Sequence, residues 1–156
     1  MTDVDNNQNI HFAMLKALGM SLGIVPTFIG VAIGIRETTM GICNSAEIKL
    51  EMSLTIIPMA FTSASLIYSL IVFFLFFGKE VKSYEMGFSF IAASTFSGIG
   101  GMLSSYAIGG ISRHACVTKA QQKKFTTQFF LMMIFAELIG IFSLIMTIVY
   151  GLKAFK

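Results

Sequence analysis

Long uncharged stretches, rich in apolar side chains, alternate along this sequence with short clusters of charged residues. Residues 17–35, 52–78 and 86–112 carry no charge, and residues 126–152 carry a single one. An α-helix of about 20 apolar residues is long enough to cross a bilayer. The pattern therefore predicts an all-α membrane protein whose four transmembrane helices lie near residues 12–35, 54–77, 86–111 and 126–152.

The composition supports this class of protein. Hydrophobic residues make up 55% of the chain and charged residues only 12%, whereas about 25% of the residues in a soluble domain are charged. The net charge of +3 is spread over short loops and does not suggest a nucleic-acid partner. Residues 1–10 are polar and lack the basic segment of a cleavable signal peptide, so we expect a short disordered tail there and a first helix that acts as its own insertion signal.

Two short polar loops are expected on one side of the membrane, over residues 36–51 and 112–125. Each contains one cysteine, Cys43 in the first and Cys116 in the second. Alternate loops of a four-helix protein face the same side, so both thiols share a compartment. Their spacing fits no metal site and demands no disulfide, so we expect free thiols.

The two halves of the chain repeat each other. A shift of 74 residues places residues 69–71 (Ser-Leu-Ile) on residues 143–145, which have the same sequence, and a shift of 75 aligns the glycine-rich parts of the first and third apolar stretches. Such self-similarity predicts two copies of one helical hairpin, over residues 11–77 and 86–152.

Small residues recur at helical spacing, and the glycines expected to serve helix packing are Gly23, Gly30, Gly34, Gly98, Gly101, Gly109 and Gly140. Within a membrane, small residues let the backbone of another helix approach closely. In each hairpin a small-residue helix is followed by a bulky one, so the hairpin is wedge-shaped. We expect such wedges to close into a ring with the small-residue helices inside.

Glu137 is the single charged residue of the fourth apolar stretch and lies close to its centre. An ionised carboxylate at mid-membrane costs roughly 2.5–3.5 kcal/mol, so the protonated form is favoured there. A carboxyl group that is neutral in lipid and ionises only beside a cation can carry protons, which is the function we predict. The alternative is that Glu137 only hydrogen-bonds a neighbouring helix. Its counterpart in the first copy of the repeat is Ser63.

Five short motifs of the sequence match a known family: Met40-Gly-Ile-Cys43, Ile57-Pro58 with Tyr68 ten residues after the proline, the stretch Gly98 to Gly110, Gln121-Gln122, and Ile134-Phe-Ala-Glu-Leu-Ile-Gly140. In these motifs, and over nearly its whole length, the sequence resembles the proteolipid c subunits of eukaryotic V-type proton-pumping ATPases. The last motif, in the fourth helix of a duplicated hairpin, is highly specific.

The resemblance implies that copies of this chain and c-type paralogues form the rotor ring of a membrane sector, while ATP is hydrolysed in a peripheral head. It implies that Glu137 carries H⁺ and is discharged by an arginine of the stator a subunit. Ser63, Ser65 and Tyr68 are predicted to hydrogen-bond its carboxyl group. No cofactor or metal is implied, and the transported ion is expected to be H⁺, because Ala64 and Ser65 stand where sodium-carrying relatives place further oxygen ligands.

The resemblance also implies a vacuolar or other acidic endomembrane, with both termini lumenal and the loops 36–51 and 112–125 cytoplasmic. Residues 112–118 (Ser-Arg-His-Ala-Cys-Val-Thr) and Lys123 depart from the family's usual turn. We therefore expect the contact of this loop with the d subunit of the rotor stalk to have diverged.

Two other functions are left open by the residues. A small multidrug antiporter also uses an intramembrane Glu in a four-helix protein, although it would carry that Glu in its first helix. A paralogous ring subunit would pack in the ring without moving protons. ATP hydrolysis by this chain itself is not expected, because it has no GxxxxGK[ST] loop.

Overall fold

The apolar stretches form four α-helices in the computed structural model, which describes residues 3–48 and 56–155. The helices are α1 Asp3–Ile48, α3 Ile57–Phe77, α4 Tyr84–Gln121 and α5 Thr126–Ala154, and a 3₁₀ turn, Lys123–Phe125, precedes α5. Within these described residues, all four helices are long and apolar enough to cross a bilayer. The chain is thus a multi-pass membrane protein, and the predicted all-α class is confirmed.

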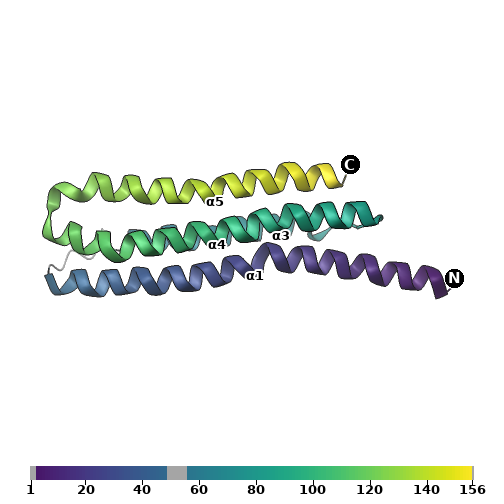
Figure 1. The fold of residues 1–156 in the computed structure, drawn as a ribbon, viewed down its shortest axis with the longest axis horizontal. Helices are drawn as coiled ribbons and strands as arrows, with labels where there is room; N and C mark the ends of the chain where they lie inside the picture. Colours follow the sequence, from purple (N-terminus) through teal and green to yellow (C-terminus); the bar gives the residue numbers. More distant parts are fainter. Residues whose placement is uncertain (1–2, 49–55, 156) are drawn as a thin grey trace.

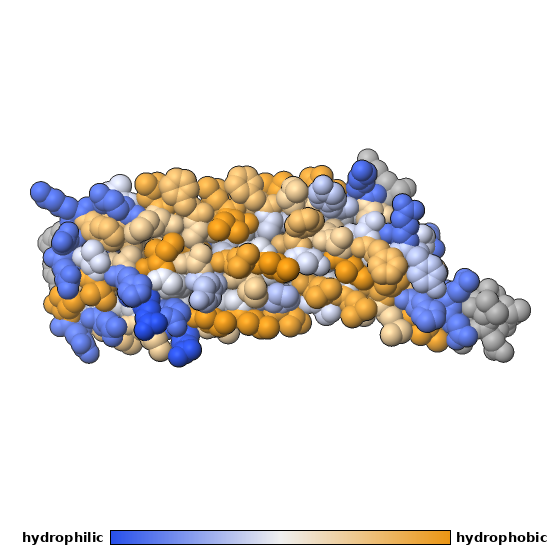
Figure 2. All heavy atoms as spheres, viewed as in Figure 1, coloured by the Kyte–Doolittle hydropathy of each residue, from blue (hydrophilic) through white to orange (hydrophobic). Residues whose placement is uncertain are grey.

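The helices lie alongside one another as two antiparallel hairpins, α1 with α3 and α4 with α5 (Figure 1). Helices α1 and α4 run in the same direction and share the most extensive helix contact of the bundle. Both ends of the described chain and the α3–α4 connection lie at one end of the bundle, which we call the terminal end, and the α4–α5 turn lies at the opposite end (Figure 1). Figure 2 shows hydrophilic residues gathered at both ends and a mainly hydrophobic surface between them.

Helices α1 and α4 approach each other through glycine. A Cβ atom added at Gly30 would lie 2.5 Å from Cα of Met102, and one added at Gly109 would lie 2.6 Å from Cα of Gly34. Backbone atoms of one helix therefore occupy the space that a side chain on the other would need. Gly34 and Gly109 are equivalent positions in the predicted repeat, so the two copies meet through the same small-residue surface.

Three further glycines lie in this α1–α4 contact. Gly23 faces Ser94, Gly98 faces the carbonyl group of Leu22, and Gly101 faces Thr27. The small-residue ridge of α4 is thus already covered by α1 of the same chain. A neighbouring copy would have to pack on other faces of the bundle.

Hydroxyl groups bridge the helices at the middle of the bundle. Ser69 Oγ donates to Thr27 Oγ1 at 2.8 Å, and Thr27 Oγ1 donates to the carbonyl oxygen of Gly98 at 3.2 Å. This chain of hydrogen bonds joins α3, α1 and α4. In a membrane no water is at hand for such groups, so each must find its partner inside the protein.

Two apolar clusters flank this polar middle. The cluster toward the opposite end consists of Ile108, Ala115, Cys116, Phe129, Met133 and Ala136. The cluster toward the terminal end consists of Val72, Phe76 and Phe90, with the rings of Phe76 and Phe90 5.3 Å apart. The first cluster joins α4 to α5 within the second hairpin, whereas the second joins α3 to α4 and so connects the two hairpins.

The helices extend beyond the predicted membrane spans, which corrects three expectations about the connecting segments. Residues 3–10, expected in a disordered tail, belong to α1. The expected loop 36–51 is helical as far as Ile48, and residues 49–55 lie outside the described residues. The expected loop 112–125 is helical as far as Gln121. Charged residues end an apolar span, but they do not end a helix, which also forms in water or against another helix.

Two contacts support the extended ends of α1 and α4. Arg113 Nη1 pairs with Glu37 Oε2 at 2.7 Å, and Gly41 lies against the backbone of Ser112 and Arg113. Cys116 is buried in the apolar cluster at this end, whereas Cys43 is exposed, and both are free thiols. Neither cysteine thus lies in a loop.

We predict that Gly30→Ala destabilises the folded protein, because its new Cβ would meet the backbone of Met102 at 2.5 Å and a backbone cannot rotate aside. Overpacking of this kind costs roughly 1–3 kcal/mol. Gly110→Ala is the matched control, since no atom lies within 4 Å of a Cβ at Gly110. The measurement is the thermal unfolding midpoint of the purified full-length chain in detergent. Equal midpoints for the two variants would contradict the close α1–α4 contact.

Candidate functional site

Glu137 lies on the buried stripe of α5 although it is acidic. Glu137 follows the buried Met133 by four residues, precedes the buried Gly140 by three and lies next to the buried Ala136, which places all four on one face of the helix. The Glu137 side chain is only 6% exposed. The face of α5 that carries this carboxyl group is therefore the same face that packs against the rest of the bundle.

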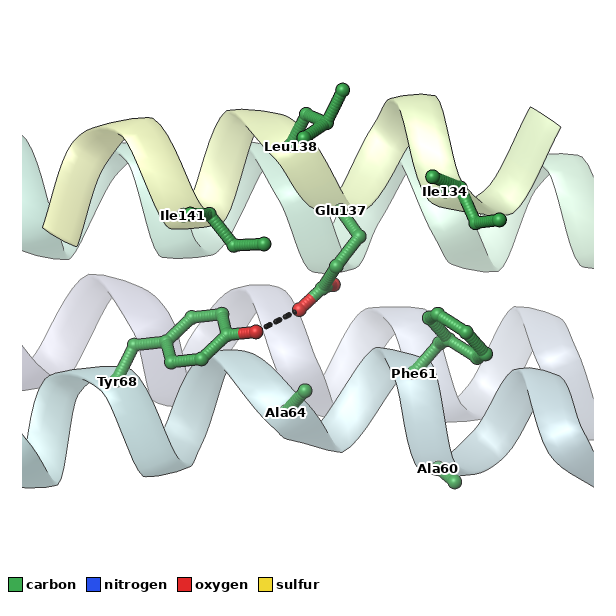
Figure 3. A pocket seen from close by; sticks show the side chains of 8 residues that line it. All are labelled: Ala60, Phe61, Ala64, Tyr68, Ile134, Glu137, Leu138 and Ile141. Carbon is green, nitrogen blue, oxygen red and sulfur yellow. Dashed lines mark hydrogen bonds between the residues drawn. The ribbon is translucent and has the colours of Figure 1, made fainter. Parts of the chain in front are cut away.

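One oxygen of the Glu137 carboxyl group is held by Tyr68. The phenol group of Tyr68, on α3, donates a hydrogen bond of 2.6 Å to Oε1 of Glu137 (Figure 3). The bond connects the two hairpins, because Tyr68 belongs to the first and Glu137 to the second. A length of 2.6 Å lies within the usual range of O–H···O hydrogen bonds.

The other carboxyl oxygen, Oε2, is buried and has no hydrogen-bond partner within the described part of the chain. A buried carboxylate with an unpaired oxygen is costly, and a protonated carboxyl group is much less so. The geometry thus suits a carboxyl group that is neutral when the bundle is surrounded by lipid.

Two residues that sequence reasoning did not connect with this site lie beside the carboxyl group. Ser104 of α4 is close to Glu137, and its hydroxyl donates to the carbonyl oxygen of Ala136 at 3.0 Å. A Cβ atom at Gly140 would lie 3.1 Å from Oγ of Ser104 and 3.5 Å from the ring of Tyr68. Gly140, predicted only as a packing residue, therefore leaves room for both hydroxyl-bearing side chains.

The structure does not bring Ser63 or Ser65 into hydrogen bonding with Glu137. Ser63 Oγ donates to the carbonyl oxygen of Ala60 at 2.9 Å, one turn earlier on its own helix. Ser65 is fully buried on the other face of α3, and its Oγ has no partner within the described residues. The helical turn separates these positions: Tyr68 points toward α5, whereas Ser65 points into the bundle with Thr62 and Ser69.

An apolar pocket of about 460 Å³ borders the carboxyl group and opens to the outside of the bundle between α3 and α5. Its lining residues are Ala60, Phe61, Ala64, Tyr68, Ile134, Glu137, Leu138 and Ile141 (Figure 3). Ala60, Ala64 and Tyr68 follow one another at every fourth position, so two small side chains leave the space into which Glu137 points. Among the described residues that line this pocket, only Tyr68 and Glu137 carry side-chain oxygens. Within the described residues, no group of three His, Cys, Asp or Glu side chains is placed to hold a metal ion.

Comparisons with known proteins find relatives of this chain. Residues 91–150, which span most of α4 and α5 and include Glu137, match the family of ATP synthase C subunits. The chain is 27% identical over 140 residues to a 16 kDa proteolipid c subunit (number 2) of the V-type proton ATPase of Caenorhabditis elegans, covering 86% of this chain and 87% of that one. It is 26% identical over 156 residues to the 16 kDa proteolipid c subunit of the rat (Rattus norvegicus) V-type proton ATPase, covering 98% and 100%.

The resemblance to V-type proteolipid c subunits is confirmed. A third relative, the 16 kDa proteolipid c subunit of the V-type proton ATPase of Nephrops norvegicus, is 29% identical over 136 residues, which cover 84% of this chain and 86% of the relative. The similarity to these proteolipids therefore extends over both hairpins. It includes the helix that carries Tyr68 as well as the one that carries Glu137.

We predict that Tyr68→Phe shifts the infrared carbonyl band of protonated Glu137 to higher frequency, because a hydrogen bond to Oε1 weakens the C=O bond and the variant lacks it. The loss of the bond should also lower the free energy of unfolding by about 1 kcal/mol. Difference spectra against Glu137→Gln identify the band. Tyr106→Phe is the control, since Tyr106 is 59% exposed. An unmoved band in Tyr68→Phe would show that the bond does not form in the membrane.

Proposed function

We propose that this chain is a proton-carrying proteolipid c subunit of a V-type rotary ATPase. The observation that carries the proposal is a buried carboxyl group midway along a membrane-spanning helix, bonded to Tyr68 at 2.6 Å and bordered by an apolar pocket. The relatives support it, because each is a V-type proton ATPase proteolipid. The chain is then a membrane-sector subunit, and ATP is hydrolysed by other subunits.

In this proposal Glu137 crosses the lipid-facing part of its path in the protonated state. The apolar lining of the pocket disfavours the ionised form. Tyr68 donates to Oε1 whether or not the group is ionised, so the carboxyl group keeps its orientation while its charge changes. Oε2, which no side chain of the described residues engages, is the oxygen left to take and release the proton. An arginine from the a subunit of the stator neutralises the carboxylate during exchange.

The same pocket favours H⁺ over Na⁺ as the transported ion. A desolvated Na⁺ needs several oxygen ligands, and among the described residues that line the pocket Glu137 and Tyr68 alone carry side-chain oxygens. Ala64 lines the pocket without an oxygen, and Ser65 points away from it. A proton needs only the carboxyl group itself, so no further ligand or cofactor enters the proposal.

Assembly into a ring is part of the proposal. The match to the ATP synthase C subunits and the proteolipid relatives both support self-association of this chain. Many large apolar side chains face outward from the isolated bundle, among them Phe88, Phe96 and Phe135. Neighbouring copies, c-type paralogues and lipid would cover these faces, with the bulky α3 and α5 on the outside of the ring.

The orientation that we propose places the terminal end in the lumen of an acidic compartment such as the vacuole. The opposite end, with residues 36–48 and 112–125, then faces the cytoplasm and contacts the d subunit of the rotor stalk. At this end Arg36, Arg113, His114 and Lys124 are exposed. The stalk partner would meet a basic surface on rigid helix ends rather than on loops.

The deciding test is proton transport by the assembled ATPase in which this chain carries Glu137→Gln. Glutamine keeps the size and most of the hydrogen bonding of the side chain but cannot ionise, so we expect complete loss of transport by a ring that still assembles. Glu80→Gln, at the exposed α3–α4 connection, is the control and should transport normally.

Two other outcomes would reject this role for Glu137. Transport by the Glu137→Gln enzyme would reduce the chain to a packing subunit, as expected for a structural paralogue. Loss of the ring itself, seen in the same membranes by native gel electrophoresis, would make Glu137 a structural residue.

A further inference from the structure

A second groove, of about 540 Å³, lies at the terminal end between the first turns of α4 and the last turns of α5. Two charged residues, Glu85 and Lys153, line it together with the hydroxyl-bearing Ser89 and Tyr150. Met86 and Ala92 supply an apolar wall. The groove therefore combines charged, hydroxyl-bearing and apolar side chains, unlike the apolar pocket at Glu137.

The two opposite charges of this groove do not pair with each other. Arg113 pairs with Glu37 at the other end of the bundle, whereas no ion pair joins Glu85 to Lys153 within the described residues. Both side chains are exposed. A carboxylate and an ammonium group on facing helices, with open space between them, present a complementary surface to a ligand that carries both charges.

The groove lies where a phospholipid headgroup would lie. Its lining residues lie in the first turns of α4 and the last turns of α5, where the apolar spans meet the charged residues Glu85 and Lys153. Below it, the rings of Phe96 and Tyr150 contact each other with centroids 5.8 Å apart, and both residues are about half exposed. An acyl chain could run along this aromatic pair while the headgroup stays in the groove.

We propose that this groove binds a zwitterionic phospholipid headgroup with a primary amine, of the phosphatidylethanolamine class. Lys153 binds the phosphate, Glu85 accepts from the ammonium group, and Ser89 and Tyr150 offer further hydrogen bonds. Lys79, Glu80 and Lys82 line an adjoining cavity that shares Met86 with the groove. Charge-assisted hydrogen bonds of this kind favour a headgroup that can donate as well as accept.

The inference does not rest on proton transport. Lys153 is 16 residues from Glu137 on α5, which corresponds to about 24 Å along a helix. Failure of one proposal therefore leaves the other standing. The lipid site would also exist in a ring subunit that does not carry protons.

The test is native mass spectrometry of the delipidated full-length chain, titrated in detergent with phosphatidylethanolamine or phosphatidylglycerol. We expect tighter binding of phosphatidylethanolamine. Lys153→Gln should weaken the binding of both lipids by roughly two- to fivefold, as expected for the loss of one exposed ionic contact. Glu85→Gln should weaken phosphatidylethanolamine alone and so abolish the preference. Lys124→Gln and Glu47→Gln, exposed residues at the opposite end, should change neither.

Three outcomes would overturn the proposal. Equal affinity for both lipids in the wild-type chain would exclude recognition of the amine. Equal binding of free phosphoethanolamine would exclude a lipid as the occupant. If Lys153→Gln left lipid binding unchanged but altered the size of the assembly in gel filtration, a second copy of the chain would be the occupant of the groove.

Discussion

The structure depends on the close approach of two helix backbones, α1 and α4. Glycines on both sides of the contact remove the side chains that would otherwise hold the helices apart, as at Gly30 against Met102. Without water to drive apolar side chains together, helices in a membrane associate through such packing and through hydrogen bonds between them. The bonds of Ser69 and Thr27 form around this contact. The positions of α3 and α5 follow from it, because each packs on α4.

The site at Glu137 is a consequence of how the hairpins are joined. Tyr68 comes from the first hairpin and Glu137 from the second, so neither hairpin holds the complete site. Ser104 and Gly140 complete the surroundings from α4 and α5. The carboxyl group is consequently held by the same tertiary contact that holds the protein together. A change in the distance between α3 and α5 would alter both the 2.6 Å bond and the pocket beside it.

The two copies of the repeat are unequal in their chemistry. In the predicted alignment, Ser63 corresponds to Glu137 and Phe142 to Tyr68. Ser63 bonds its own helix, and Phe142 is 62% exposed on the outside of α5. The positions equivalent to Glu137 and Tyr68 in the other copy of the repeat thus hold neither a carboxyl group nor a phenol group that could donate to one. The helical hairpin thus occurs twice, but the buried carboxyl group is carried by the second copy.

Much of the fold could be predicted from the sequence, because an apolar stretch of membrane length has few structural options. The number and class of the helices, the repeat and the isolated acid Glu137 all follow from side-chain polarity along the chain. The helix ends could not be found that way, since polarity marks the membrane boundary, whereas α1 and α4 continue along each other past Glu37 and Arg113. The hydrogen-bond partner of Glu137 could not be predicted from the sequence either. Ser63, Ser65 and Tyr68 lie within two turns of one helix, and only the rotation of that helix relative to α5 brings Tyr68 to the carboxyl group. Residues distant in sequence, such as Ser104, join the site through helix packing alone.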